Sequence, residues 1–438
     1  MPGQTLATPL LALFLAVSSP WGRQTSDEEE PFTEPTRRFE VGVLFDLRLA
    51  FTDDTSSFME RGLGKLRYGG SAEGKKQVLG RLSQLSLTSD LRLTESVGAR
   101  LHVNFDADPD FGDAGERTDL IEAYLRYRLG VGDRNEVRGK AGLFFPAISL
   151  EHPGEAWTTF YTITPSILNG WIGEEIRSLG IEASFARVGL ENEVSFTAAG
   201  FGWNDPSASL LAYRGWASTD RQTGFADRIP IPPLSSFSEG GIFSAQAPWA
   251  EPIREVDDRV GYYAGASWDN YRRFLVNALY YDNRARPVAL DSGQYGWATR
   301  FYEAGFLYSL SEGTSGPELL FQVLGGDTWM GGSGPGQPKV TFDYRTAYLL
   351  GTVPLGRQRV SFRYDWFEMV DRDEFRDVDD NDEDGYGITL AYLVRTTETQ
   401  RLAVELLGVR SHRPAREFLG LPTEATEWML QLSYRFAF

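Results

Sequence analysis

Cysteine is absent from the chain of 438 residues, and histidine is scarce, with three residues. The absence of cysteine excludes disulfide bonds and thiolate metal sites. No spacing around His102, His152 or His412 indicates a serine or a water activated by a histidine, which a hydrolase needs. We therefore predict no enzymatic activity, no catalytic residues, no metal site and no cofactor.

Long apolar runs are also missing beyond the N-terminus. A membrane-spanning helix needs about 18 or more apolar residues in succession, and no later stretch approaches this length. Aromatic residues nevertheless reach 13%, the chain holds 46 glycines, and the mean hydropathy is −0.31. This combination is typical of the alternating strands and turns of an outer-membrane barrel. A large soluble β-protein is the alternative.

Basic residues are outnumbered by acidic residues, 43 to 61, which leaves a net charge of −18. Such a chain is a poor partner for nucleic acid, whose phosphates attract lysine and arginine. The sum says little about the interior of a channel, where the position of each charge matters more than the total.

The N-terminus is predicted to be a secretory signal peptide, residues 1–18. Residues 10–17 form a short apolar core, and Ala16, Val17 and Ser18 offer a small-x-small cleavage site. The residues before this core carry no lysine or arginine, which is atypical. Residues 19–37 contain an acidic, proline-bearing stretch and are predicted to be a disordered periplasmic lead-in. Residues 38–438 are predicted to form the barrel.

The pattern that the chain does contain is an alternation with a period of two, clearest in residues 427–438. One face of this stretch is large and apolar: Trp428, Leu430, Leu432, Tyr434, Phe436 and Phe438. An exposed edge strand of this kind would aggregate in a soluble protein. The wall of a membrane barrel needs such a face, with aromatic residues at the two interfaces.

The same alternation recurs along the whole chain, beginning at residues 38–51. It predicts an all-β, transmembrane antiparallel β-barrel of about 16 strands. Short and long connections follow each other throughout, as the periplasmic turns and outer loops of such barrels do. An even number of strands places both termini in the periplasm. Residues 202–259 are the uncertain region, because a hidden hairpin there would give about 18 strands.

Residues 146–179 are unusually apolar for a connection that lies in water. They include Trp157, Tyr161, Ile167, Trp171 and Ile172. We expect this loop to fold into the barrel and form the constriction. The alternative is a lid over the barrel mouth.

At this point the chain resembles the trimeric sixteen-stranded porins, which share the strand number, the terminal phenylalanine and an inward loop between the fifth and sixth strands. Residues 164–175 (TPSILNGWIGEE) and 124–128 (YLRYR) are most similar to the phosphate-selective porin O/P family. The resemblance implies a homotrimer in the outer membrane of a Gram-negative cell, and luminal arginines and lysines that attract anions.

Charged residues at inward positions are expected to set the selectivity of the channel. The third to fifth strands carry Arg100, Arg126, Arg128, Arg138 and Lys140, with only Asp106 and Glu122 beside them. The neighbouring loop carries Glu151, Glu155, Glu174 and Glu175. A basic wall that faces an acidic loop would create a transverse field across the constriction, which Trp171 would also line. The alternative is that these charges are solvated or paired across strands. Asp343 and Arg345 are also expected to face inward.

Residues 371–384 form the most acidic stretch, and Asp380, Asp382, Asp384 and Gly385 match the start of an EF-hand. Position twelve would be Ala391 rather than Glu, so we expect a solvated outer loop. Weak Ca²⁺ or Mg²⁺ binding that bridges lipopolysaccharide phosphates is the alternative.

The sequence thus predicts an outer-membrane porin for passive diffusion of small hydrophilic solutes, with a preference for anions such as phosphate. Its expected partners are outer-membrane lipid and lipopolysaccharide, the transported solutes, and two further copies of the chain. One alternative is a sugar-selective channel in which Trp157, Tyr161 and Trp171 stack on sugar rings. Another is a non-conducting structural or receptor barrel plugged by residues 202–259.

Overall fold

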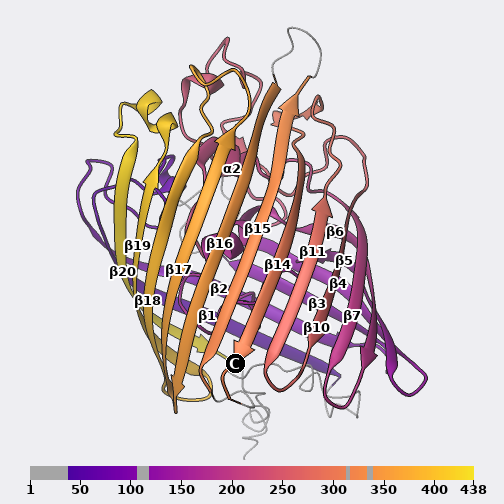
Figure 1. The fold of residues 1–438 in the computed structure, drawn as a ribbon. Coiled ribbons are helices and arrows are strands. Elements are labelled where there is room, and N and C mark those ends of the chain that lie inside the picture. Colours follow the sequence, from indigo (N-terminus) through magenta and orange to yellow (C-terminus); the bar gives the residue numbers. More distant parts are fainter. Residues whose placement is uncertain (1–37, 106–117, 312–315, 333–338) are drawn as a thin grey trace, which may run out of the picture.

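The computed structural model describes residues 38–105, 118–311, 316–332 and 339–438. In these residues, sixteen long antiparallel strands form one closed barrel in which each strand pairs with its neighbours in chain order (Figure 1). The predicted signal peptide (residues 1–18), the lead-in (residues 19–37) and Asp106 lie outside the described residues. The strands are β1 (Phe39–Thr52), β2 (Val78–Arg92), β3 (Val97–Phe105), β4 (Thr118–Val131), β5 (Asn135–Phe144), β6 (Ser178–Val188), β7 (Glu193–Gly202), β10 (Gly261–Asp269), β11 (Phe274–Asp282), β14 (Ala298–Ser309), β15 (Glu318–Gly331), β16 (Lys339–Leu355), β17 (Gln358–Asp371), β18 (Glu383–Arg395), β19 (Gln400–His412) and β20 (Glu424–Ala437).

The remaining elements are short and lie in the connections. They are the helices α1 (Ile167–Glu175), α2 (Ser209–Arg214), η1 (Phe58–Glu60), η2 (Ser235–Phe237) and η3 (Pro414–Leu419), and two small strand pairs, β8 (Ile229–Pro230) with β9 (Trp249–Ala250) and β12 (Leu290–Asp291) with β13 (Gln294–Tyr295). The uncertain region between β7 and β10 contains α2 and the separate pair β8–β9 but adds no strand to the barrel, so the count is sixteen rather than eighteen. None of the helices in the described part of the chain is long and apolar enough to cross a membrane.

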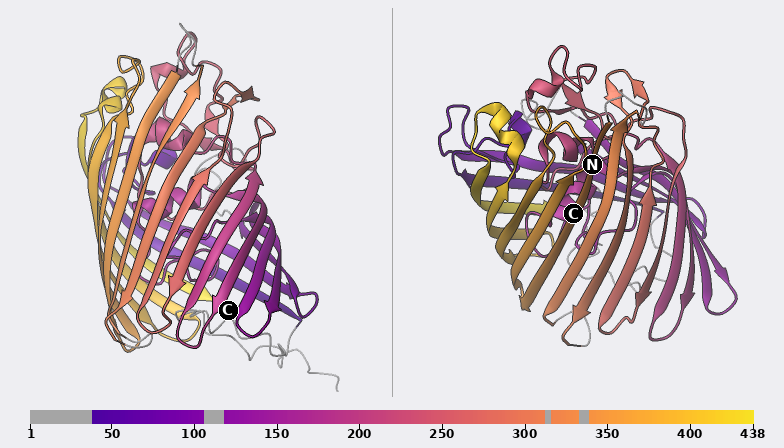
Figure 2. Two further views of the ribbon diagram at one scale, coloured as in Figure 1. Left: turned by 45° about the vertical axis from the view of Figure 1, so that its right-hand side comes forward. Right: turned by 45° about the horizontal axis from the view of Figure 1, so that its top comes forward.

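The long connections gather at one end of the barrel and the short turns at the other (Figures 1 and 2). The two ends of the wall meet where β20 pairs with β1, with Leu432 opposite Leu49 and Phe436 opposite Phe45. Phe438 continues this pairing, since its backbone N–H donates to the Val43 carbonyl at 3.0 Å. Every strand of the wall therefore has two partners, so the apolar terminal strand presents no exposed edge.

The alternation predicted from the sequence separates two faces of the wall. Outward positions are large, apolar and exposed, as in Leu47, Leu349 and Leu432, whereas inward neighbours such as Asp46, Arg48 and Arg435 are buried. A continuous exposed apolar band of this kind suits contact with lipid hydrocarbon.

Asp343 and Arg345 are exceptions to the predicted orientations, because they face outward rather than into the lumen. Arg345 lies 3.7 Å from Glu368, and Asp343 lies 2.7 Å from Arg372, in pairs on the outer wall. The reason is that the inner face of β16 is taken by aromatic side chains such as Tyr344, which is fully buried.

The interior of the barrel contains a hydrophobic core on one side. The inner faces of β11 and β14–β17 carry large apolar side chains between polar ones such as Gln322 and Arg363, and the loop after β5 packs on them together with α1. The buried wall residues include Leu279, Tyr281, Phe301, Leu320, Leu324, Phe342, Tyr344, Tyr348, Leu350 and Phe367. The inward side chains of β3–β5 are instead polar and partly exposed. We call the side packed around α1 the dry half of the lumen and the side lined by β3–β5 the wet half.

Contact of the outer wall with lipid can be tested at Leu349, which lies 46% exposed between Phe321 and Tyr364 on the neighbouring strands. Leu349→Arg would place a charge in the hydrocarbon region. We expect it to lower the free energy of unfolding in lipid vesicles by about 2–4 kcal/mol in urea titrations.

The same substitution at Leu190, which is 95% exposed in the turn between β6 and β7, serves as the control. Leu190→Arg should change the free energy of unfolding by less than about 0.5 kcal/mol. Equal effects at the two positions would contradict a lipid-facing wall.

Candidate functional site: the barrel lumen

Residues 145–177, here called the inward loop, fold into the barrel as predicted and are held there by carboxylates of the far wall. Glu405 on β19 accepts from the backbone N–H groups of Ile163 at 2.6 Å and Thr164 at 3.1 Å. Asp365 on β17 accepts from the N–H of Ile167 at 3.1 Å. These acceptors lie on the inner face of the wall, so the loop is not a lid over the mouth.

The helix α1 begins where Ser166 caps it, with the Ser166 hydroxyl accepting from the N–H of Asn169 at 3.2 Å. Its Trp171 side chain is 3% exposed and meets the rings of Phe301 and Tyr344, each at a centroid distance of 5.5 Å. Burial of a tryptophan in such a core is worth about 3–5 kcal/mol relative to alanine. The dry half of the lumen is thus a packed core.

Residues 203–260, here called the crossing segment, cross the lumen in their first part, between Asn204 and Phe225. The segment starts at the β11 side, where Tyr281 donates to Asn204 at 2.5 Å. It then reaches β18, where the N–H of Trp216 donates to Glu383 at 2.9 Å. It continues to β1, where Asp220 accepts from Arg48 at 2.5 Å. It then reaches β4, where the N–H of Phe225 donates to the carbonyl of Leu120.

The five predicted basic residues of β3–β5 do face the lumen, but each has a carboxylate partner. The pairs are Arg100–Asp90 at 2.7 Å, Arg126–Asp90 at 3.3 Å, Arg128–Glu136 at 2.8 Å, Arg138–Glu193 at 2.8 Å and Lys140–Glu182 at 3.4 Å. Most of the acids come from the neighbouring strands β2, β6 and β7. The alternative of charges paired across strands therefore describes this wall.

In three of these pairs the cation is clearly more exposed than the anion, namely Arg126–Asp90, Arg138–Glu193 and Lys140–Glu182. The side chain of Lys140 is 31% exposed and that of Glu182 is 6% exposed, while Arg126 reaches 49%. Arg100 and Arg128 are about as exposed as their partners. We call these five residues and their partners the paired wall.

The acidic loop expected opposite this wall is only partly present. Glu155 is 40% exposed and lies 3.7 Å from Arg100. Glu151, Glu174 and Glu175 are buried, and so is Trp171, so these residues do not border open space. The reason is that α1 turns toward the crossing segment: Glu174 pairs with Arg214, and Glu175 accepts from the N–H of Leu211 at 2.8 Å.

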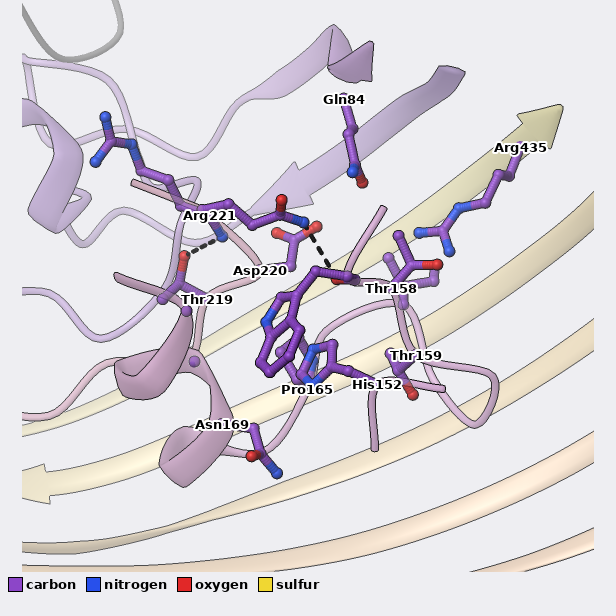
Figure 3. A pocket seen from close by; sticks show the side chains of 15 residues that line it. Gln84, His152, Thr158, Thr159, Pro165, Asn169, Thr219, Asp220, Arg221 and Arg435 are labelled. Atoms are coloured by element: carbon purple, nitrogen blue, oxygen red, sulfur yellow. Dashed lines mark hydrogen bonds between the residues drawn. The ribbon is translucent and has the colours of Figure 1, made fainter. Parts of the chain in front are cut away.

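A small cavity lies where the inward loop meets the crossing segment (Figure 3). Its lining includes Gln84, His152, Trp157, Arg221 and Arg435, and its volume of about 10 Å³ suits one water molecule. The Trp157 ring is stacked between Phe145 at 3.7 Å and His152 at 4.4 Å. Neither face of this ring is free to stack on a sugar.

Arg177 is a luminal residue that sequence reasoning missed. It is 1% exposed and lies 3.6 Å from the centre of the Phe145 ring. Its guanidinium donates to the carbonyls of Ile121 at 2.5 Å, Gly173 at 3.2 Å and Thr223 at 3.1 Å. No sequence signal identifies it, because its partners are backbone groups and Ile121 lies at a β-bulge of β4.

Comparison with solved structures finds the same architecture in outer-membrane channels. The outer membrane channel DcaP of Acinetobacter baumannii is 9% identical, with 91% of this chain and 97% of that chain covered and a TM-score of 0.55. An anion-selective porin from Comamonas acidovorans is 12% identical, with 91% and 99% covered and a TM-score of 0.50. OprB of Pseudomonas putida is 11% identical, with 91% and 94% covered and a TM-score of 0.50.

This chain has the porin barrel fold. No family model matches its sequence, and no curated protein does. At identities this low, the likeness to these channels extends to the fold and leaves solutes and selectivity to be argued from the lumen itself.

The contact between α1 and α2 is predicted to depend on pH through Glu175. Burial raises the pKa of this carboxyl to about 8 from an ordinary value of 4.5, with Arg214 opposing the shift and Glu174 adding to it. Because the folded state holds this proton more tightly than the unfolded chain, stability is highest below about pH 4.5 and falls up to about pH 8. We expect Glu175→Gln to remove much of this decline.

Amide hydrogen exchange at Leu211, corrected for the intrinsic rate at each pH, measures the contact directly. Its protection should fall between pH 5 and pH 8.5 in the natural chain and change much less in the Gln variant. Parallel pH profiles in the two proteins would show that Glu175 is ionised in the folded state.

Proposed function

We propose that the protein is an outer-membrane channel for passive diffusion of small hydrophilic solutes, and that the passage follows the paired wall of β3–β5. The observation that carries this proposal is the partial exposure of charged side chains inside a closed barrel whose outer face is apolar. In this proposal the short turns and both termini are periplasmic, and the long connections face outward. Outer-membrane lipid and lipopolysaccharide surround the wall, and the resemblance to trimeric porins supports a homotrimer.

The selectivity that we propose is weak. The resemblance to phosphate-selective porins favours anions, and the greater exposure of Arg126, Arg138 and Lys140 relative to their partners acts in the same direction. The carboxylates 2.7–3.4 Å from these cations offset most of that field. Charge in the passage then guides solutes without strongly excluding one sign, and phosphate is one of several small anions that pass.

A plugged barrel is the second candidate function. It is favoured by the crossing segment, which reaches β11, β18, β1 and β4, and by the core that fills the dry half. A sugar-selective channel has less support, because Tyr161 and Trp171 are buried and Trp157 is covered on both faces.

Planar-bilayer recordings of the purified protein test the proposal. We expect discrete conductance steps and a permeability ratio for anions over cations of about 1 to 3, because the wall charges are paired. Arg126→Ala should lower this ratio, since Arg126 is the most exposed cation of the paired wall.

Arg345→Ala is the matched control, because Arg345 is similarly exposed but faces outward. It should leave conductance and permeability ratio unchanged. No conductance from correctly folded protein would favour the plugged barrel, and a ratio far above 1 that survives Arg126→Ala would contradict a passage along the paired wall.

A further inference from the structure

The crossing segment begins with two unlike parts, which lie before β8. Residues 203–218 anchor it, since Leu211, Tyr213 and Trp216 are each at most 1% exposed within the luminal core. Residues 219–228, with the sequence TDRQTGFADR, are almost entirely polar. Their one large apolar side chain, Phe225, stacks on Trp203 at 5.1 Å rather than entering the core. We call residues 219–228 the polar span.

The polar span lies over the wet half of the lumen and is held there by polar contacts: Asp220 pairs with Arg48 and Arg67, and Gln222 donates to the carbonyls of Ala156 and Trp157. The N–H of Phe225 donates to the Leu120 carbonyl at 2.9 Å, and Asn104 donates to Gln222 at 3.3 Å. Leu120 and Asn104 lie on β4 and β3, the strands that carry Arg126 and Arg100, further from the end with the short turns. Removal of the span would therefore open the space above the paired wall. These contacts are hydrogen bonds and ion pairs rather than apolar packing, so water can replace them when the span moves.

Arg177 is one of the groups that hold the polar span, beside Arg48 and Arg67, which pair with Asp220. One guanidinium nitrogen donates both to Gly173 on α1 and to Thr223 in the span, and the other donates to Ile121 on β4. Among the ion pairs of the described residues, none includes Arg177, whereas all five cations of the paired wall have a carboxylate partner. A buried cation whose contacts are backbone carbonyls gains from hydration when its cover moves away.

We propose that the polar span is a gate over the passage along the paired wall and that Arg177 is one of the residues that latch it. When the gate is closed, Arg177 joins the polar span to α1 and to the bulge of β4. When the span moves away, Arg177 loses its contact with Thr223 and faces the passage as a cation without a carboxylate partner. This inference rests on the proposed channel function, but movement of the span can be measured without any conductance.

The first experiment uses the absence of cysteine from the chain, which makes any introduced thiol unique. Thr223→Cys places a thiol in the polar span, and Thr299→Cys places one under the anchored part, where Thr299 donates to the Ser207 carbonyl at 2.7 Å. Both threonines are 0% exposed. A charged, membrane-impermeant thiol reagent applied to proteoliposomes should label the thiol at position 223 on the order of tenfold faster than the thiol at position 299. Equal labelling rates would overturn the gate.

The second experiment tests the latch through two variants of Arg177 in the Thr223→Cys background. Arg177→Lys keeps the charge but loses the forked donors, and Arg177→Gln loses both. Each should raise the labelling rate at position 223 on the order of tenfold, the factor for loss of one charge-assisted hydrogen bond. The Lys variant should keep the anion-to-cation permeability ratio of an open channel, whereas the Gln variant should lower it. A purely structural role would leave this ratio the same in the two variants.

A reversible cross-link provides the closing test. A Cβ built at Gly224 lies 2.5 Å from the Cβ of Asp119, so small shifts allow a disulfide in Asp119→Cys/Gly224→Cys. Oxidation should block conductance and reduction should restore it. The control pair is Leu66→Cys/Ser218→Cys, at two residues whose backbones already form a β-bridge in the anchored part. This cross-link should leave conductance unchanged.

The outcomes separate the gate from the channel. Heat-modifiable mobility in gels confirms that each variant is folded. Rapid labelling at position 223 in a protein without conductance would support movement of the polar span and contradict the proposed channel function. If conductance persists after the cross-link between positions 119 and 224 has formed, the channel function is supported and the gate is contradicted.

Discussion

The packing of α1 against the aromatic inner face of β14 and β16 is the interaction on which the rest of the lumen depends. Trp171 lies between Phe301 and Tyr344, and the carboxylates of Asp365 and Glu405 accept from the adjoining backbone. A barrel of sixteen strands is wide enough for a water-filled interior. Here the inward loop occupies one side of it as a hydrophobic core, so water and solute are left with the side formed by β3–β5.

The electrostatics of the wet half follow from this division. With Glu151, Glu174 and Glu175 drawn into the packed interior, the paired wall must be neutralised from its own neighbours. Asp90, Glu182 and Glu193 supply this charge from β2, β6 and β7. Arg177 is the contrasting case, because its guanidinium donates to backbone carbonyls and none of the ion pairs in the described residues includes it.

The barrel wall was predictable from the sequence because its signal is local. The alternation in residues 38–51 and 427–438 has a period of two, and this period identifies the outward faces of β1 and β20 without knowledge of their register. The same rule failed at Arg345, because β16 carries aromatic residues on its inner face and polar ones on its outer face near the rim. Alternation along a strand shows that its two faces differ. It does not show which of the two faces the lumen.

The interior was less predictable because its contacts join residues that are distant in the sequence. Glu405 meets Ile163 across 242 positions, and Arg138 meets Glu193 across 55. The apolar composition of residues 146–179 was enough to predict an inward loop. The course of the crossing segment and the carbonyl contacts of Arg177 depend on backbone positions that composition does not encode.

Water accessibility of the two halves of the lumen is the most direct test of this account. Thr197 on β7 and Thr346 on β16 both point inward, but Thr197 is partly exposed and Thr346 is 1% exposed beside the luminal core. Single cysteines at the two positions can be reacted with a small charged thiol reagent in lipid vesicles. The account predicts rapid reaction at position 197 and little at position 346. Equally rapid reaction at both would show that the lumen is open throughout and would contradict a dry half packed around α1.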